Sequence, residues 1–147
     1  MTAHQAALEA LTRYFGYDSF RPGQQGIVEA LLAGRDVLGV MPTGAGKSVC
    51  YQIPAALSPG ATLVISPLIS LMRDQVDALN DLGMPAAFIN TTQTPDEQAM
   101  VFAQAAAGQI KLLYVAPERL ETGRFRDFAA RTPISLIAVD EAHCVSQ

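Results

Sequence analysis

The sequence has few cysteines, no long apolar run and no excess of positive charge, and each scarcity excludes a class of protein. Cys50 and Cys144 are its two cysteines, and without metal-type spacing they predict reduced thiols rather than a disulfide framework. No apolar run approaches the roughly 18 residues that a membrane span needs. Residues 1–15 lack the basic and then apolar stretch of a signal peptide. We therefore expect a cytoplasmic protein without a membrane segment.

The net charge of −4 does not by itself favour nucleic acid as a partner. Contact with a phosphate backbone requires a local basic stripe rather than a basic total, so a DNA partner has to be inferred from motifs. With 147 residues, half of them apolar, the chain is long enough for one globular domain with a real core.

Five short apolar segments rich in β-formers recur along the chain and predict strands. Their apolar character is nearly continuous rather than alternating, which is typical of strands covered on both faces. The five segments are residues 36–41, 61–66, 86–90, 111–115 and 134–139.

Helical patterns separate these strands. Residues 69–79 carry one apolar stripe made of Ile69, Met72, Val76 and Leu79. Thr94, Pro95 and Glu97 form the pattern of a capping box at a helix start. Two more helices, at 3–15 and 24–33, precede the first strand. This alternation predicts an α/β fold with a parallel sheet, in which 1–147 is one domain or part of one and 1–34 is a helical segment.

A glycine-rich loop, MPTGAGKS at residues 41–48, directly follows the first predicted strand. Glycines there let backbone N–H groups turn inward and cradle phosphate oxygens at a helix N-terminus. Lys47 would reach the β- and γ-phosphates, and the Ser48 hydroxyl would bind Mg²⁺. Met41 departs from the strict pattern, and a simple glycine-rich turn remains the alternative. The predicted nucleotide-binding residues of the loop are Pro42, Thr43, Gly44, Ala45, Gly46, Lys47 and Ser48.

The last predicted strand runs directly into Asp140-Glu141-Ala142-His143. A strand that ends in two acids holds carboxylates at the carboxyl edge of the sheet. Asp140 would hold Mg²⁺ through a water molecule, and Glu141 would orient and deprotonate the attacking water. Alone, this tetrapeptide could also begin a helix. Together with the glycine-rich loop it indicates a P-loop site that hydrolyses nucleotide, with Lys47, Asp140 and Glu141 as its catalytic residues.

At this point the chain resembles a known family. The segments at 41–48, 66–75 (SPLISLMRDQ), 112–120 (LLYVAPERL) and 139–147 (VDEAHCVSQ) are similar to motifs I, Ia, Ib and II of superfamily 2 helicases in their RecQ form. FGYDSFRPGQ at 15–24 resembles motif 0 of the RecQ family. The resemblance covers essentially the whole chain. The PTRELA-like and TPGR-like motifs of DEAD-box RNA helicases are absent from the sequence.

The resemblance implies an ATP-dependent DNA helicase of DNA repair and recombination that moves 3′ to 5′, with ATP and Mg²⁺ as its cofactors. In RecQ proteins the motif 0 loop recognises adenine. Gln24 would hydrogen-bond the adenine edge through its amide, which is both donor and acceptor. Tyr17 and Arg21 would flank the ring by stacking.

The resemblance also implies a DNA track for junctions of single-stranded and duplex DNA. Its candidate residues are Ser66, Ser70, Arg73 and Arg119. His143 would couple the ATP site to later motifs. The polar stretch at 90–93 could touch DNA as well, and whether it does is left open.

RecQ proteins continue beyond the DEAH motif with an aromatic-rich loop, a Ser-Ala-Thr motif and a second RecA-like domain that carries an arginine finger. Many add a zinc-binding and winged-helix region, so zinc is possible outside this chain. We expect 1–147 to be the first part of a RecA-like domain, incomplete on its C-terminal side and inactive alone. Two alternatives stay open: a non-catalytic nucleotide-binding fragment, and a superfamily 2 translocase on DNA or RNA that does not unwind.

The resemblance further predicts a gap in the sheet. In RecA-like motors the strand with the Ser-Ala-Thr motif lies between the P-loop strand and the DEAH strand. Segments 36–41 and 134–139 should then be separated by two strand spacings, roughly 10 Å, and lined by unpaired backbone groups. Such groups are costly, so we expect the isolated chain to be marginally stable or prone to aggregate.

Overall fold

The computed structural model describes residues 2–35, 48–66 and 69–139 of the chain. They form two compact units, one within 1–58 and one within 59–147. The first unit contains helices α1 (Ala3–Phe15), α2 (Gln24–Leu32) and α3 (Val49–Leu57). The expected strand at 36–41 lies outside the described residues, and so does the predicted gap beside it.

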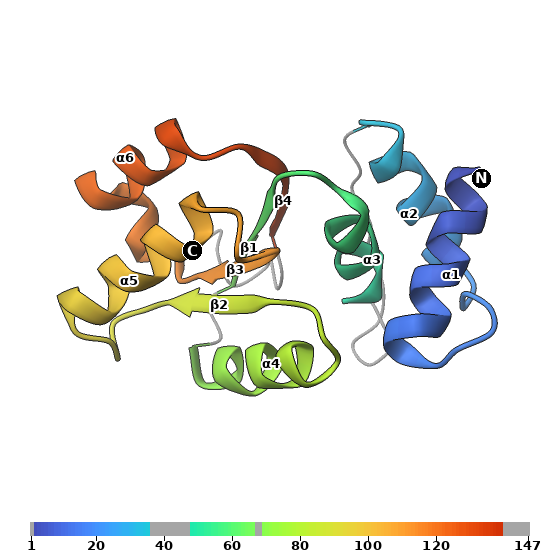
Figure 1. The fold of residues 1–147 in the computed structure, drawn as a ribbon, viewed down its shortest axis with the longest axis horizontal. Helices are drawn as coiled ribbons and strands as arrows, with labels where there is room; N and C mark the ends of the chain where they lie inside the picture. Colours follow the sequence, from blue (N-terminus) through green and yellow to red (C-terminus); the bar gives the residue numbers. More distant parts are fainter. Residues whose placement is uncertain (1, 36–47, 67–68, 140–147) are drawn as a thin grey trace. The chain divides into compact units, whose positions relative to one another are not determined.

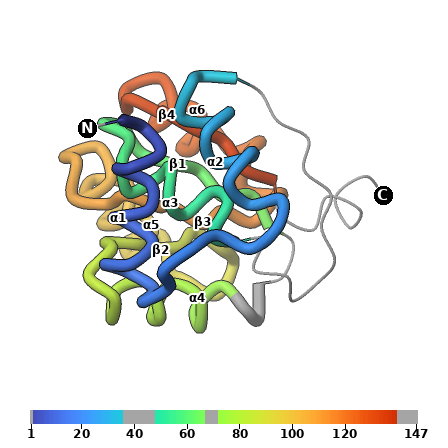
Figure 2. The backbone as a smooth tube through the Cα atoms, turned by 90° about the vertical axis from the view of Figure 1, so that its right-hand side faces the viewer, coloured from blue at the N-terminus to red at the C-terminus, as the bar shows by residue number. Residues whose placement is uncertain are grey.

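The second unit is a parallel sheet with helices on both sides (Figure 1). Its elements in chain order are β1 (Ala61–Ile65), α4 (Ile69–Asp81), β2 (Ala86–Ile89), α5 (Pro95–Ala106), β3 (Leu112–Val115), the 3₁₀ helix η1 (Pro117–Glu121), α6 (Gly123–Arg131) and β4 (Ile134–Val139). The strand order is β2-β3-β1-β4, which Figure 2 shows as a succession from β4 to β2. The parallel α/β fold and four of the five predicted strands are confirmed.

Local sequence signals explain where several helices begin and end. Thr94 Oγ1 accepts from the Glu97 backbone N–H, and Glu97 accepts from the Thr94 N–H at 2.9 Å, so the predicted capping box is present. The same contacts lower the pKa of Glu97, chiefly through the Thr94 backbone N–H. Thr2 and Gln5 form a second capping box at the start of α1, which the sequence reading missed. None of the described helices is long and apolar enough to span a bilayer.

One core cluster of the second unit lies between the sheet and helices α5 and α6. Leu63, Leu113 and Val115 are buried on that side of the sheet. Phe102 of α5 packs against Phe128 of α6, with ring centroids 4.9 Å apart. Phe125 completes the aromatic cluster, 6.0 Å from Phe128. Helix α6 was not predicted, although a capping threonine at 122 and phenylalanines three residues apart are its sequence signals.

The expectation that residues 134–139 are covered on both faces is wrong for the described structure. Residues of β1 and β3 are almost all buried, but β4 alternates, with Ile137 59% and Val139 49% exposed. The physical reason is that one face of β4 is not covered by the described helices; among the described strands β4 pairs with β1 alone and forms one edge of the sheet.

A close approach of two backbones joins β4 to the start of β1. The ladder shifts register between Ala61 and Thr62, which leaves Ser135 as an extra residue in β4. The Ser135 Oγ accepts from the Gly60 N–H at 2.8 Å. A Cβ at Gly60 would lie 2.6 Å from that Oγ and 2.7 Å from the Pro133 carbonyl oxygen, so only glycine fits.

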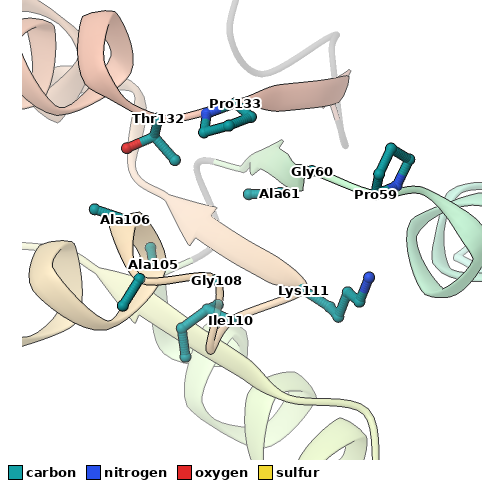
Figure 3. Close-up of a pocket in the computed structure, with 11 residues that line it drawn as sticks. Pro59, Gly60, Ala61, Ala105, Ala106, Gly108, Ile110, Lys111, Thr132 and Pro133 are labelled. Carbon is teal, nitrogen blue, oxygen red and sulfur yellow. The ribbon is translucent and has the colours of Figure 1, made fainter.

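The amino-terminal edge of the sheet carries a small pocket of about 180 Å³ beside this contact (Figure 3). Most of its lining is small and apolar, including Gly60, Ala61, Ala105, Ala106 and Gly108. This edge of the sheet therefore has a cavity with few polar side chains, so it is a poor candidate for a catalytic or phosphate-binding site.

We predict that Gly60→Ala destabilises the protein by about 1–3 kcal/mol, the usual cost of forcing an extra methyl group into a packed site. Thermal melts of the intact protein would show a lower Tm. Gly123→Ala is the matched control, because nothing lies within 4 Å of its Cβ position and its φ is not positive. Equal melting temperatures for the Gly60 variant and wild type would contradict the close contact.

Candidate functional site

The carboxyl ends of all four strands lie at one level. Ile89 of β2 pairs with Val115 of β3, Val115 pairs with Ile65 of β1, and Ile65 pairs with Val139 of β4. The described residues that follow β1, β2 and β3 therefore lie at the same edge of the sheet. They are Ser66, Asn90 and Ala116. In open parallel α/β sheets this edge is where ligands bind.

The first candidates at this edge follow β1. Ser66 is buried, and its N–H donates to the Val115 carbonyl oxygen at 3.1 Å, extending the ladder by one bond. Ser70 lies in the first turn of α4, and its side chain is outside what the structure describes. Arg73, one turn further along α4, is exposed. Of these three candidates, Arg73 has a side chain that the structure places in contact with solvent.

Arg119 follows β3 in the 3₁₀ helix η1 and is half-buried. Its carbonyl oxygen accepts from both the backbone N–H and the hydroxyl of Thr122, so its backbone is held firmly. Its Nε is buried without a hydrogen-bond partner among the described residues. Within that part of the chain no carboxylate lies within ion-pair distance of the guanidinium. A cation without an internal counter-ion suits a phosphate ligand.

The stretch 90–93 forms a turn that is held by three side-chain amides. Asn90 Oδ1 accepts from the Thr92 N–H at 2.9 Å, and Gln93 Nε2 donates to the Phe88 carbonyl oxygen at 2.8 Å. Gln98 of α5 donates to the Asn90 carbonyl oxygen at 2.9 Å. Asn90 itself is only 2% exposed, so its side chain serves the fold rather than pointing to a ligand. The sequence analysis missed this role, since two of the three amides look like ordinary loop residues.

In the first unit, a turn with a defined sequence signature positions Gln24. Pro22 and Gly23 occupy its two centre positions, Gly23 has φ +89°, and the Gln24 N–H donates to the Arg21 carbonyl oxygen at 3.0 Å. These are the features of a type II turn, which needs glycine at its third residue. Gln24 Oε1 accepts in return from the Arg21 N–H at 2.8 Å. Gln24 is buried, and the contact with Arg21 fixes which end of its amide is the oxygen.

Tyr17 is held near this turn by the end of α1. Gly16, at φ +74°, closes that helix with a bond from its N–H to the Thr12 carbonyl oxygen. The Thr12 hydroxyl donates to the Tyr17 carbonyl oxygen at 2.9 Å. The Tyr17 side chain is 51% exposed and Arg21 is exposed, so the Tyr17 ring and the Arg21 guanidinium are both available for stacking on a ligand.

Helix α3 follows the glycine-rich loop in the sequence and packs on α2, which carries Gln24, and on α1, which ends two residues before Tyr17. Val49 and Ile53 of α3 share a core cluster with Val28 of α2 and Leu11 of α1. Ser48, directly before α3, is helical, and its side chain makes no capping hydrogen bond. Its hydroxyl is therefore not used by the helix start. Cys50 is buried, and burial raises the pKa of its thiol.

Nine predicted site residues lie outside the described residues. They are Pro42, Thr43, Gly44, Ala45, Gly46, Lys47, Asp140, Glu141 and His143. The described parts place their neighbours: Ser48 precedes α3, and Val139 ends β4 at the carboxyl edge.

Comparison with known proteins gives one consistent result. Residues 21–147 match the model of the DEAD/DEAH box helicase family. The chain is 52% identical over 141 residues to the ATP-dependent DNA helicase RecQ of Haemophilus influenzae, covering 96% of this chain and 23% of that protein. It is 47% identical over 142 residues to the protein of the same name in Bacillus subtilis, covering 96% and 24%. The chain thus spans about a quarter of the length of these curated relatives.

A solved structure shows the same fold at lower sequence identity. The hypothetical ATP-dependent RNA helicase from Sulfolobus tokodaii superposes with a TM-score of 0.73 at 21% identity, covering 97% of this chain and 42% of that chain. At this level of identity the likeness supports the fold alone.

We predict that Asn90→Ala lowers the free energy of unfolding by about 1–2 kcal/mol, because it removes a buried acceptor from the Thr92 backbone and hydroxyl. Thr91→Ala, at an exposed neighbouring position, should change it by less than about 0.5 kcal/mol. Denaturant unfolding of both variants measures the difference. Weaker DNA binding by the Asn90 variant at unchanged stability would mean that Asn90 contacts nucleic acid directly.

Proposed function

Because this chain belongs to the DEAD/DEAH box helicases, and within them to the RecQ family, we propose that the intact protein unwinds DNA 3′ to 5′ with energy from ATP. The chain would supply the ATP- and Mg²⁺-binding half of the motor and part of the DNA track. The observation that carries this proposal is the common carboxyl edge. The residues after β1 and β3 lie at the level where Val139 ends β4, and Asp140 is the next residue in the sequence.

The adenine end of the nucleotide would be bound by Gln24, Tyr17 and Arg21. Gln24 Oε1 accepts a hydrogen bond from the Arg21 N–H, which fixes the orientation of the amide that would pair with the adenine edge. Tyr17 and Arg21 offer an exposed aromatic face and an exposed guanidinium for stacking on the ring. Because Gln24 is buried, a base that cannot pair with its amide would leave a hydrogen bond unmade, and this cost favours adenine.

The phosphate end would be bound by the loop 42–48, with backbone N–H groups and Lys47 facing the oxygens. The described Ser48 fits its role, because its hydroxyl takes no part in capping α3 and an oxygen donor is what Mg²⁺ prefers. Mg²⁺, when bound, neutralises charge on the β- and γ-phosphates. Asp140 would hold it through water, and Glu141 would orient the attacking water and remove its proton.

The DNA strand would run along the carboxyl edge of the second unit. Arg119 would contact its phosphates, since it has no internal carboxylate partner within the described residues, and exposed Arg73 would assist. Ser66 and Ser70, at the start of the α4 segment, are the other proposed contacts. His143 would transmit the state of the ATP site to later motifs. The isolated chain is not expected to unwind DNA.

The proposal is tested in the intact protein with Lys47→Ala and Glu141→Gln. Lys47→Ala should abolish ATP-dependent unwinding of a forked duplex while DNA binding remains. Glu141→Gln should retain ATP affinity but lower the turnover number roughly 10²–10⁴-fold, the usual contribution of a general base. Glu9→Gln, which removes an exposed carboxylate of α1, is the control. Unwinding at the wild-type rate by the Lys47 variant would refute the P-loop assignment.

The adenine contact is tested with Gln24→Ala. Loss of a buried amide that pairs with adenine costs about 1–3 kcal/mol, so KM for ATP should rise roughly tenfold or more. The preference for ATP over GTP in a competition assay should narrow as well. Gln25→Ala changes the same residue type at an exposed position and should leave both values unaltered. Unchanged discrimination by the Gln24 variant would remove adenine recognition from this residue.

A further inference from the structure

The two helix layers of the second unit differ in charge. The exposed charged residues of α4 are one arginine and three aspartates, Arg73, Asp74, Asp77 and Asp81. Those of α6 are three arginines and one aspartate, Arg124, Arg126, Arg131 and Asp127. α4 lies on one side of the sheet, and α6 lies on the other beside α5 (Figure 1). In a chain of net charge −4, α6 is therefore a local basic surface.

Two of the α6 arginines have no partner among the described residues. Arg124 Nη1 donates to the Pro95 carbonyl oxygen at 3.0 Å, which ties it to the start of α5. Arg126 and Arg131 are exposed and form neither a hydrogen bond nor an ion pair with any described residue. They lie on either side of the exposed Ala130, about 140° apart around the helix axis and about 7.5 Å apart along it. The exposed arc between the two arginines holds Ala130, whose small side chain leaves room for a phosphate backbone, and Asp127, the one acidic residue of α6.

Hydrogen bonds at Thr122 hold the start of α6 to the 3₁₀ helix η1, which carries Arg119. The Arg119 carbonyl oxygen accepts from the Thr122 N–H and hydroxyl, and the same hydroxyl oxygen accepts from the Phe125 N–H at 3.2 Å to cap α6. Phe125 and Phe128 then anchor the helix in the core. Arg119 and the arginines of α6 are therefore held in fixed positions relative to one another, Arg119 shortly after β3 and the other three along α6.

We propose that α6 is a binding surface for the duplex arm of the DNA substrate, and that Arg126 and Arg131 contact the phosphate backbone of that duplex. The proposal rests on the proposed DNA helicase function and extends it beyond the single-strand track. Single strands are held by stacking on exposed aromatic rings, but both phenylalanines of α6 are buried and no large apolar side chain of α6 is exposed. Duplex backbones are bound through charge alone, which is what α6 offers.

The experiment uses the intact protein with Arg126→Glu, Arg131→Glu and the double variant. Binding to a blunt duplex, a forked duplex and a single-stranded oligonucleotide is measured at several salt concentrations. We expect the double variant to bind both duplex-containing DNAs roughly tenfold more weakly at low salt. The slope of log K against log salt should become shallower by about 0.9 for each lost phosphate contact. Single-strand affinity and the single-strand-stimulated ATPase rate should be unchanged.

Matched controls separate the specific effect from general ones. Arg13→Glu changes the net charge as much as either single variant, but it lies on α1 in the first unit. Arg126→Lys with Arg131→Lys keeps the charge and should bind like wild type, and circular dichroism melts check that each variant folds.

Three outcomes would overturn the proposal: duplex binding that is unchanged, duplex binding that Arg13→Glu weakens equally, or single-strand affinity that falls in parallel. Unchanged DNA binding together with loss of a protein–protein contact in a crosslinking assay would assign α6 to an acidic protein partner instead. If wild-type protein shows no DNA-stimulated ATP hydrolysis, the proposed function itself fails, whatever the α6 variants do.

Discussion

The parallel backbone ladder is the constraint on which the rest of the second unit depends. Because Ile89, Val115, Ile65 and Val139 are paired in register, the four described strands all end at the same edge of the sheet. Parallel strands also require crossovers of a dozen or more residues, and each crossover here contains a helix that covers one face of the sheet. Residues that follow different strands, far apart in the sequence, thereby become neighbours at one edge of the sheet.

Side-chain amides then hold the loops that leave the structure's regular elements. Asn90, Gln93 and Gln98 satisfy the backbone of the turn after β2, and Gln24 satisfies the backbone of the turn before α2. In each case a buried or half-buried amide replaces the hydrogen bonds that a helix or strand would supply. Loops held in this way keep their shape without a ligand, which lowers the entropic cost of binding one.

The opposite edge of the same sheet is built for packing. Gly60, the bulge at Ser135 and the small residues around the pocket bring backbones close together and leave few polar groups exposed to a ligand (Figure 3). Charge is distributed as unevenly as polarity, since α4 is acidic and α6 is basic. The two sides of the sheet thus differ in charge: α4 carries Arg73 near its start and three aspartates after it, whereas α6 is basic along its length.

The sequence by itself determined what depends on neighbouring residues: the strands of the second unit, the capping box at Thr94, the stripe on α4 and the motifs that identify the family. Periodicity and short motifs are local, so they survive without knowledge of the fold. Only the tertiary structure decided that Asn90 is a buried hub, that β4 exposes Ile137, and that Gly60 must lack a side chain. The contact between Gly60 and Ser135 spans 75 residues, and no local pattern encodes a distance between segments so far apart. The unpaired charges of α6 were equally invisible, because burial and the absence of a partner are properties of surroundings that only folding assembles.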